Sequence, residues 1–234
     1  MCVSQPERYY ALMTYEKRGL LRYLAHLDIA RAFDRAVRRA RIPVQYSEGF
    51  APRAQLSFPP PLPVGAEGTA ELCAVELAEP VEAERLYAAL APQLERFRIS
   101  QIQVRRTTRR LSWGKLQAAS YEALPDFIDQ VQPAALAQAT ANLLAEDQLI
   151  IERQTKTRTR SLDIRPHIYA LRAVGDAVSM CVGITEETLV KPSELLAALA
   201  NLVGASEHGW RRLVRTGLHF EMPPENGRTP SSEA

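Results

Sequence analysis

The chain has 234 residues, of which 46% are hydrophobic and 24% are charged, and its 29 Lys and Arg against 27 Asp and Glu leave a formal net charge of +2. This composition is typical of a folded globular protein and excludes a chain that is disordered over most of its length. It contains neither an uncharged apolar run of about 18 residues nor a basic start followed by an apolar stretch, so we expect no membrane span, no secretory leader and a cytoplasmic protein.

The chain opens with a predicted strand and a predicted helix. Residues 9–15 are rich in aromatic and apolar side chains, which favours a strand. After it, Ile29, Phe33 and Val37 recur at helical spacing on one face. We expect this helix to end before Pro43, because proline disfavours a helical residue in front of it and lacks a backbone donor.

The next segment, residues 43–68, is rich in proline and glycine and is expected to be mostly looped, with strand character only at residues 54–58. A nearly continuous apolar run then predicts a buried strand at residues 69–77. A helix at residues 82–90, with acidic residues in its first turn, and a strand at residues 99–106 complete the first half.

The second half repeats this alternation. Apolar periodicity, a proline at the start of each predicted helix and the Gly175-Asp176 turn indicate its elements. The expected elements are a strand at 120–124, a helix at 133–146, a strand at 149–155, a hairpin of strands 168–174 and 178–184, a helix at 192–203 and a strand at 210–220.

This order predicts an α+β protein made of two ferredoxin-like (split β-α-β) halves in tandem. We place the first half at residues 1–114 and the second at residues 115–220. The polar, proline-containing tail at residues 221–234 is expected to be disordered.

The small net charge conceals a strong segregation of charged residues. Residues 96–115 carry seven basic and no acidic residues, whereas residues 67–95 carry seven acidic residues against Arg85 alone. A second basic stretch, residues 153–172, alternates Lys and Arg with Thr and Ser. Both residue types donate hydrogen bonds to phosphate, so these stretches favour binding to a polyanion such as RNA, with the solvated surface of a strand or loop as the alternative.

The three cysteines, Cys2, Cys73 and Cys181, are odd in number and far apart in the sequence. They therefore form neither a disulfide framework nor the CxxC or CxxxCxxC spacing of zinc and iron–sulfur sites. We predict no metal site and no resident cofactor.

The segment after the first strand holds the most distinctive motifs. HLD stands at residues 26–28, RAVRRARIPVQYSEGF at 35–50, SF with PLPVG at 57–65, and DIRP at 163–166. These motifs resemble the family of bacterial radical-SAM-linked proteins of unknown function (DUF2344 type), and the resemblance spans residues 8–218. It implies a separate cobalamin-binding radical SAM protein as partner. Where family members commonly carry Asn and His in GFNPHP, this chain has Ala51 and Arg53, so a role for that histidine does not transfer.

We rank three functions. The first is an accessory protein that binds RNA (tRNA or rRNA) and presents it to the radical SAM enzyme, without being an enzyme itself. The second is a protein–protein adaptor for that enzyme, which docks through the acidic residues 67–95. The third is an RNA-modifying or RNA-cleaving enzyme that uses His26 with Asp28 or Tyr46. Residues two apart, such as His26 and Asp28, do not face each other on a helix. The alternative to catalysis is therefore that His26 hydrogen-bonds a backbone group at the start of the helix.

The predicted RNA-binding residues come from the first helix, the loop after it and the two basic stretches. They are Arg31, Arg35, Arg38, Arg39, Arg53, Arg105, Arg106, Arg109, Arg110, Trp113, Lys115, Lys156, Arg158, Arg160 and Arg165. Trp113 is the expected stacking platform, and the aromatic residues Tyr46, Phe50 and Phe58 either stack on bases or anchor their loop to the sheet. Arg165 either pairs with Asp163 to fix a turn or is presented to phosphate. The motif loop contributes Ser47, Gly49, Phe50, Pro52 and Ser57.

Overall fold

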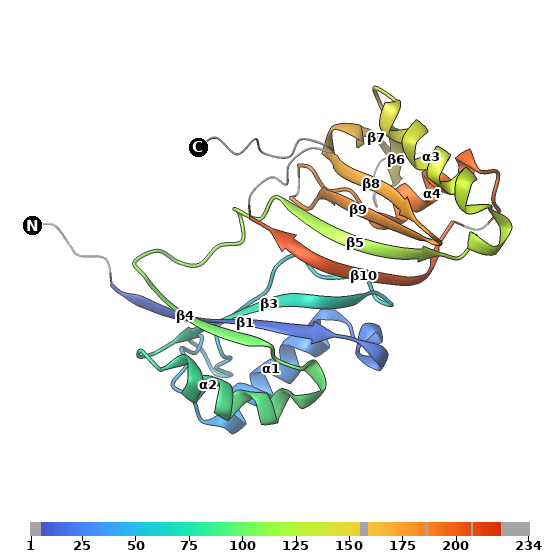
Figure 1. Cartoon of the computed structure of the whole chain (residues 1–234). Helices are drawn as coiled ribbons and strands as arrows, with labels where there is room; N and C mark the ends of the chain where they lie inside the picture. The colour runs from blue at the N-terminus through green and yellow to red at the C-terminus, as the bar shows by residue number, and fades with distance from the viewer. Residues whose placement is uncertain (1–5, 155–158, 186, 207, 221–234) are drawn as a thin grey trace, which may run out of the picture. The chain divides into compact units, whose positions relative to one another are not determined.

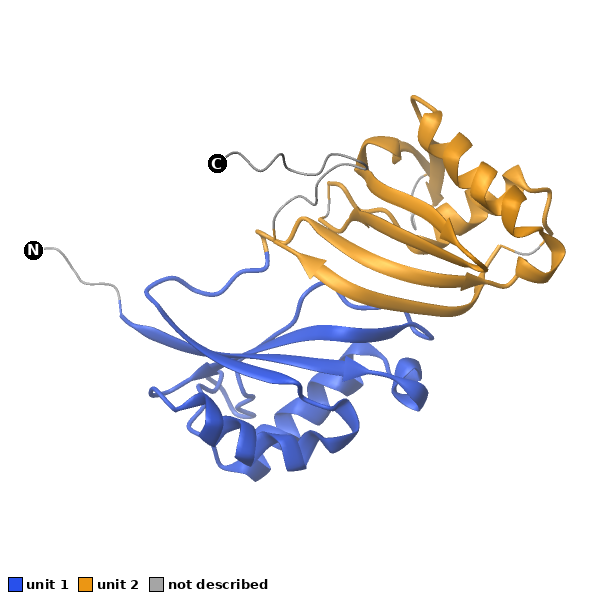
Figure 2. Cartoon of the chain, viewed as in Figure 1, with its two compact units in different colours: residues 1–113 blue, residues 114–234 orange. Residues whose placement is uncertain are grey.

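The computed structural model describes residues 6–154, 159–185, 187–206 and 208–220. The chain divides into two compact units, Met1–Trp113 (unit 1) and Gly114–Ala234 (unit 2), coloured separately in Figure 2. Both units combine helices with a β-sheet, which confirms the predicted α+β class. The predicted disordered tail at residues 221–234 lies outside the described residues, as do Lys156 and Arg158.

Unit 1 packs its helices on one face of an antiparallel sheet (Figure 1). The strand order is β4-β1-β3, and the short β2 pairs with the remaining edge of β3. Its elements are β1 (Arg8–Lys17), η1 (Gly19–Tyr23), α1 (His26–Ala40), β2 (Leu56–Ser57), β3 (Glu67–Leu77), α2 (Ala83–Leu90), η2 (Ala91–Phe97) and β4 (Gln101–Thr107).

Helix α1 follows the predicted apolar spacing, since Ile29, Phe33 and Val37 are buried. It ends at Arg41, which adopts a left-handed conformation with φ of 51° shortly before Pro43. Only two residues separate this cap from Val44, which is buried and pairs with Leu77 of the sheet. The chain therefore returns to the sheet immediately after the helix.

The core of unit 1 is centred on the ring of Phe33, which is fully buried. Its centroid lies 4.9 Å from that of Tyr15, 5.3 Å from that of Phe97 and 5.6 Å from that of Phe58. These tilted and edge-on contacts are the favoured geometries for aromatic pairs, so one residue of α1 joins the sheet, η2 and the 53–58 segment.

Replacing Phe33 by Ala should therefore destabilise the protein strongly. A cavity of this size in a packed core costs about 3–5 kcal/mol of unfolding free energy. Urea denaturation followed by circular dichroism would measure it, and Leu20→Ala, at a side chain that is 86% exposed, is the matched control with a change within about 0.5 kcal/mol. A Phe33→Ala protein as stable as the Leu20→Ala protein would contradict this account of the core.

Unit 2 has an antiparallel sheet in the order β10-β5-β9-β8. Its elements are β5 (Ala118–Pro125), η3 (Ile128–Gln130), α3 (Pro133–Ala145), β6 (Ile150–Gln154), β7 (Thr159–Asp163), η4 (Arg165–His167), β8 (Ile168–Val174), β9 (Ala177–Gly183), α4 (Pro192–Leu202) and β10 (Trp210–His219). The predicted hairpin is confirmed as β8 and β9, which turn at Gly175 with φ of 58°.

Strand β6 differs from the expected arrangement. It does not enter the larger sheet but pairs with β7, a strand that the sequence pattern did not predict, to form a separate two-stranded sheet. Outside the larger sheet β6 has no buried face: Ile150 is 55% exposed and no residue of the strand is buried. The prediction of a strand here is therefore confirmed, whereas the expectation that it joins the main sheet of the second half is wrong.

Within the described ranges, no helix combines the length and apolar character needed to cross a membrane.

Candidate nucleic-acid interface

A groove of about 540 Å³ lies between the first half of α1 and the segment at residues 53–58. Arg31 and Arg35 line it from α1, where their spacing of four residues places both on one side of the helix. Arg53 lines it from the segment that follows the motif loop. Arginines from two separate parts of the sequence thus line one groove.

Two of these three arginines are not engaged elsewhere. Arg31 pairs with Asp28 at 3.3 Å on the exposed surface. In the described part of the chain, the guanidinium groups of Arg35 and Arg53 have neither a hydrogen-bond nor an ion-pair partner, and both residues are exposed. An anion in the groove would therefore not have to displace a protein carboxylate from Arg35 or Arg53.

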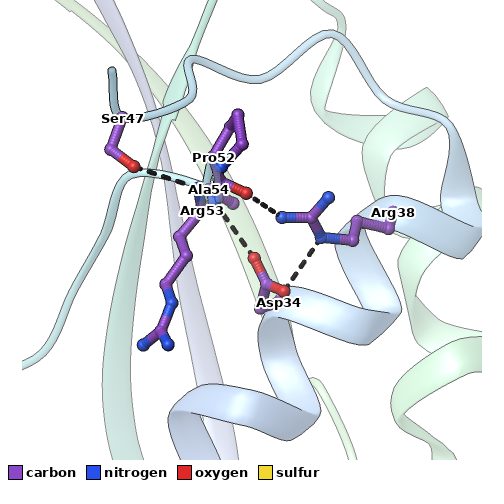
Figure 3. Close-up of polar contacts among 6 residues, drawn as sticks. All are labelled: Asp34, Arg38, Ser47, Pro52, Arg53 and Ala54. Atoms are coloured by element: carbon purple, nitrogen blue, oxygen red, sulfur yellow. Dashed lines mark hydrogen bonds and ion pairs between the residues drawn. The ribbon is translucent and has the colours of Figure 1, made fainter. Parts of the chain in front are cut away.

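Asp34 fixes the segment that carries Arg53 (Figure 3). Its Oδ1 accepts the backbone N–H of Ala54 at 3.0 Å, and its Oδ2 accepts the Nε–H of Arg38 at 2.9 Å. Arg38 also donates to the carbonyl of Pro52. We call these contacts of Asp34 and Arg38 with Ala54 and Pro52 the Asp34 clamp. In Figure 3 the Arg53 side chain extends away from them, so the clamp holds the backbone of the segment and leaves the Arg53 guanidinium available.

The loop that precedes Arg53 is closed by a second pair of bonds. The Arg53 N–H donates to Ser47 Oγ at 3.0 Å, and the Ser47 N–H donates to the Arg53 carbonyl at 2.8 Å. Between them Gly49 has φ of 116°, a conformation that L side chains rarely adopt, and Phe50 is fully exposed. The motif loop thus presents an aromatic ring to solvent on a short, closed turn.

The clamp also sets the ionisation of Asp34. Burial on its own would raise the pKa of this carboxyl, but the hydrogen bonds from Arg38 and Ala54, with the charges of Arg38 and Arg53, lower it below its ordinary value. The carboxylate form therefore holds the loop at neutral pH.

Replacing Asp34 by Asn should destabilise the protein by about 1–2 kcal/mol at pH 7, because it removes the charge from hydrogen bonds made by a carboxylate. Since the folded pKa is lowered, the advantage of the wild type is present above the ordinary carboxyl pKa, about 4, and is lost as the pH falls through the folded value. Urea denaturation at pH 7 and at about pH 3 would measure both differences.

Asp28→Asn is the matched control for this prediction, because among the described residues the Asp28 carboxylate pairs only with Arg31, on the exposed surface, and such a pair should contribute little at either pH. A difference between the wild type and Asp34→Asn that stays the same from pH 7 to pH 3 would show that the charge of Asp34 is not what holds the loop.

The residues expected to form a catalytic group are not brought together. His26 is the exposed first residue of α1, and its ring lies edge-on to Phe58 with centroids 5.3 Å apart. Asp28 turns to Arg31, and the Tyr46 ring stacks with the guanidinium of Arg38 at 5.1 Å. Among the described residues, no hydrogen bond joins His26, Asp28 and Tyr46.

The other predicted basic residues of unit 1 are divided among several roles. Arg38 is used by the clamp, and Arg106 forms an ion pair with Glu7. Arg110 lines two cavities other than the groove. The remaining predicted arginines of this unit, which are exposed, are Arg39 on α1, Arg105 on β4 and Arg109 after it.

Trp113 and Phe58 take structural positions. The Trp113 Nε1–H donates to Ser57 Oγ at 2.8 Å, and the indole is half-buried. Phe58 packs edge-on against Phe33 and His26. Of the aromatic residues expected either to stack on bases or to anchor the loop, Phe58 anchors it, whereas Phe50 remains exposed.

In unit 2 the predicted residues Lys115 and Arg160 are exposed, whereas Arg165 is engaged. Its guanidinium donates to the carbonyls of Leu144 at 2.5 Å and Glu146 at 3.1 Å, at the C-terminal end of α3. A cation there satisfies carbonyls that the helix leaves open. Asp163 instead accepts backbone N–H groups, among them that of Arg165 at 3.0 Å. The DIRP motif therefore fixes a turn, though not by a side-chain ion pair, and we leave Arg165 out of the interface.

One pairing with chemical potential was missed from the sequence. Ser120 Oγ lies 2.7 Å from His219 Nε2, and Cys181 is the register partner of Ser120 on β9. Because 99 residues separate Ser120 from His219, no local signal could have indicated the contact. In the part of the chain described, no carboxylate bonds the second ring nitrogen of His219, so the pair lacks the group that orients a catalytic histidine.

The buried thiols are not poised for reaction. Burial raises the pKa of Cys73 well above its ordinary value, and it also raises that of Cys181, against a smaller lowering by a hydrogen bond with Ser120. Both therefore stay protonated, which is the unreactive form. The described ranges contain no group of three or more His, Cys, Asp or Glu side chains placed to hold a metal ion.

A family profile described as "uncharacterized protein conserved in bacteria (DUF2344)" matches residues 11–192, which is most of the chain. The chain belongs to this family. No curated protein matches it. Among solved structures, the crystal structure of an unknown protein from Galdieria sulphuraria is 13% identical and covers 85% of this chain and 91% of its own, with a TM-score of 0.23. A likeness at that TM-score carries no argument about fold or function.

Proposed function

We propose that this protein of the DUF2344 family binds single-stranded RNA at the α1 groove and presents it to a separate radical SAM enzyme. The observation that carries the proposal is that Arg35 and Arg53 both line the groove although they come from different segments, and that among the described residues their guanidinium groups have no partner. Phosphates of a nucleic-acid backbone are the anions that such spaced arginines bind, and the Asp34 clamp holds the backbone of the segment that carries Arg53 before a ligand arrives.

The groove suits a single strand because its wall is mixed. Beside the arginines it is lined by the apolar side chains of Leu27, Leu56 and Phe58. Single-stranded RNA offers unstacked bases to apolar and aromatic side chains while its phosphates contact cations. The exposed ring of Phe50, on the loop closed by Ser47 and Arg53, provides a stacking face next in sequence to the groove.

The radical SAM partner enters through the motif resemblance. The HLD, YSEGF and DIRP motifs resemble those of radical-SAM-linked proteins, and the 234 residues contain no CxxxCxxC sequence of their own. In this proposal the cleavage of S-adenosylmethionine belongs to the partner, and this chain supplies the RNA-binding surface.

Removing Arg35 and Arg53 should weaken RNA binding and its dependence on salt. For single strands each phosphate contact contributes about 0.7 to the slope of log affinity against log salt, so the Arg35→Ala, Arg53→Ala double variant should show a slope lower by about 1.4. Fluorescence anisotropy with a labelled oligouridylate at several salt concentrations measures this slope.

The control for this experiment is Arg85→Ala, an exposed arginine of unit 1 on α2 that does not line the groove. Its binding curve should overlay that of the wild type. Equal losses in the Arg85→Ala and the groove variants, or no RNA binding by the wild type at low salt, would contradict the proposal.

A second candidate function, an adaptor that docks the enzyme, is favoured by the exposed acids around the start of α2. Of the predicted acidic flank, Glu67, Glu71 and Glu76 are buried in unit 1. By contrast, Glu79, Glu82 and Glu84 are exposed, which leaves an acidic surface beside α2. Such a surface is suited to steer a basic partner.

Reversing Glu82 and Glu84 to Lys should weaken co-purification with the radical SAM partner after nuclease treatment, because the charge of the docking surface changes sign. Pull-down from cells that express both proteins is the measurement, with the Asp147→Lys, Glu152→Lys double variant, at exposed acids outside residues 67–95, as control. Complex recovery that is unchanged in the double variant would rule out this surface as the docking site.

Catalysis by His26 has the least support, because its ring packs edge-on against Phe58 and Asp28 is paired with Arg31.

We also infer that each unit is a ferredoxin-like fold. With β2 on the edge of β3, unit 1 has the order β4-β1-β3-β2, in which the first and third strands are central. Unit 2 has β10-β5-β9-β8, the same order if β5, β8, β9 and β10 are its four strands. In this assignment the β6–β7 sheet is an insertion between α3 and β8.

A further inference from the structure

Unit 1 holds two adjoining cavities that differ from the α1 groove. They measure about 390 and 250 Å³, and Gln55, Glu76 and Arg110 line both. Their combined volume falls in the range of pockets that hold small organic ligands, about 300–1,000 Å³. None of the three arginines of the groove lines either of them.

Backbone hydrogen bonds join three of the polar residues that line the larger cavity. The Gln45 N–H donates to the Glu76 carbonyl at 2.9 Å, the Gln55 N–H to the Gln45 carbonyl at 2.9 Å, and the Glu76 N–H to the Gln55 carbonyl at 3.0 Å. These backbone bonds fix three polar side chains as neighbours. In the described residues, the side-chain amides of Gln45 and Gln55 make no hydrogen bond within the protein.

The charges of the cavities leave one cation uncompensated. The Glu76 carboxylate, whose side chain is 9% exposed, is paired with Arg8 Nη1 at 2.5 Å. Arg110 has no ion-pair or hydrogen-bond partner in the described part of the chain, and it stands where the two cavities adjoin. Glu7 also lines the larger cavity, and its carboxylate is paired with Arg106. With both lining carboxylates paired, Arg110 is the lining cation left for an anionic group of a ligand.

Two tyrosines complete the walls. Tyr46 lines the larger cavity, is 39% exposed, and has the Arg38 guanidinium over its ring at 5.1 Å. Tyr10 lines the smaller cavity and is 4% exposed, and its buried hydroxyl has no hydrogen-bond partner among the described residues.

We infer that these cavities bind a nucleoside monophosphate unit, with the phosphate at Arg110 and the base at Tyr46, Gln45 and Gln55. Arginine binds phosphate through charge-assisted hydrogen bonds. Amide side chains both donate to and accept from the edges of bases, and an aromatic ring offers a stacking face. The unit has two sources, a free nucleotide or the phosphorylated end of an RNA strand, which share this chemistry.

Isothermal titration calorimetry of the full chain with AMP, adenosine and inorganic phosphate tests the site. AMP should bind at least about tenfold more tightly than either fragment, because only AMP contacts both ends of the site. Arg110→Gln should weaken AMP binding by about tenfold to a hundredfold, the value of a hydrogen bond to a charged group. Arg109→Gln, at the neighbouring exposed arginine that lines neither cavity, should leave it unchanged.

The two sources and the groove are separated by further arms of the experiment. If the strand end is the ligand, a 5′-phosphorylated oligouridylate should lose affinity in Arg110→Gln while its 5′-hydroxyl counterpart does not; if a free nucleotide is the ligand, AMP alone should be affected. The Arg35→Ala, Arg53→Ala variant should keep AMP binding, so failure of this site and failure of the groove are distinguishable. AMP that binds no more tightly than phosphate, or equal losses in Arg110→Gln and Arg109→Gln, would overturn the inference.

Discussion

The groove depends on the hydrogen bonds that the Asp34 carboxylate accepts from Ala54 and Arg38. The segment at residues 43–68 contains many prolines and glycines and forms little regular structure, so some of its backbone donors are bonded within it and others need partners outside it. Asp34 supplies one from α1 by accepting the Ala54 N–H, and it orients Arg38, which binds the Pro52 carbonyl. A single helical residue thus couples the position of Arg53 to the helix that carries Arg35.

This arrangement shows why a run of arginines in the sequence is a poor guide to a binding surface. Arg35 and Arg38 stand one turn apart on α1, yet Arg35 is unpaired among the described residues while Arg38 is consumed by the clamp. Arg165, in a basic stretch, completes the end of a helix. The acids divide in the same way, since Glu76 is buried against Arg8 and Glu82 is exposed. Counting charged residues along the chain does not show which of them are free to bind a ligand. That depends on whether each charged side chain has a partner within the folded protein.

Elements with strong local periodicity were predicted well. Helix α1 and the β8–β9 hairpin follow from the spacing of apolar side chains and from turn residues, because both signals act within a few positions. The pairing of β6 with β7, the contact of Ser120 with His219 and the convergence of Arg35 with Arg53 depend on chain segments brought together by the fold. The candidate site was therefore predicted in its residue types and in its location on α1 and the motif loop, but not in which arginines would be available.

Ser57 has a consequence for how the protein can be studied. It lines both the α1 groove and the smaller cavity beside Arg110, and its Oγ accepts a hydrogen bond from the indole N–H of Trp113. The emission wavelength of an indole shifts with the polarity and hydrogen bonding around its nitrogen, and the chain has only two tryptophans. With Trp210 replaced by Phe, Trp113 becomes an intrinsic fluorophore whose spectrum reads out the surroundings of a hydroxyl common to both sites, without any attached dye.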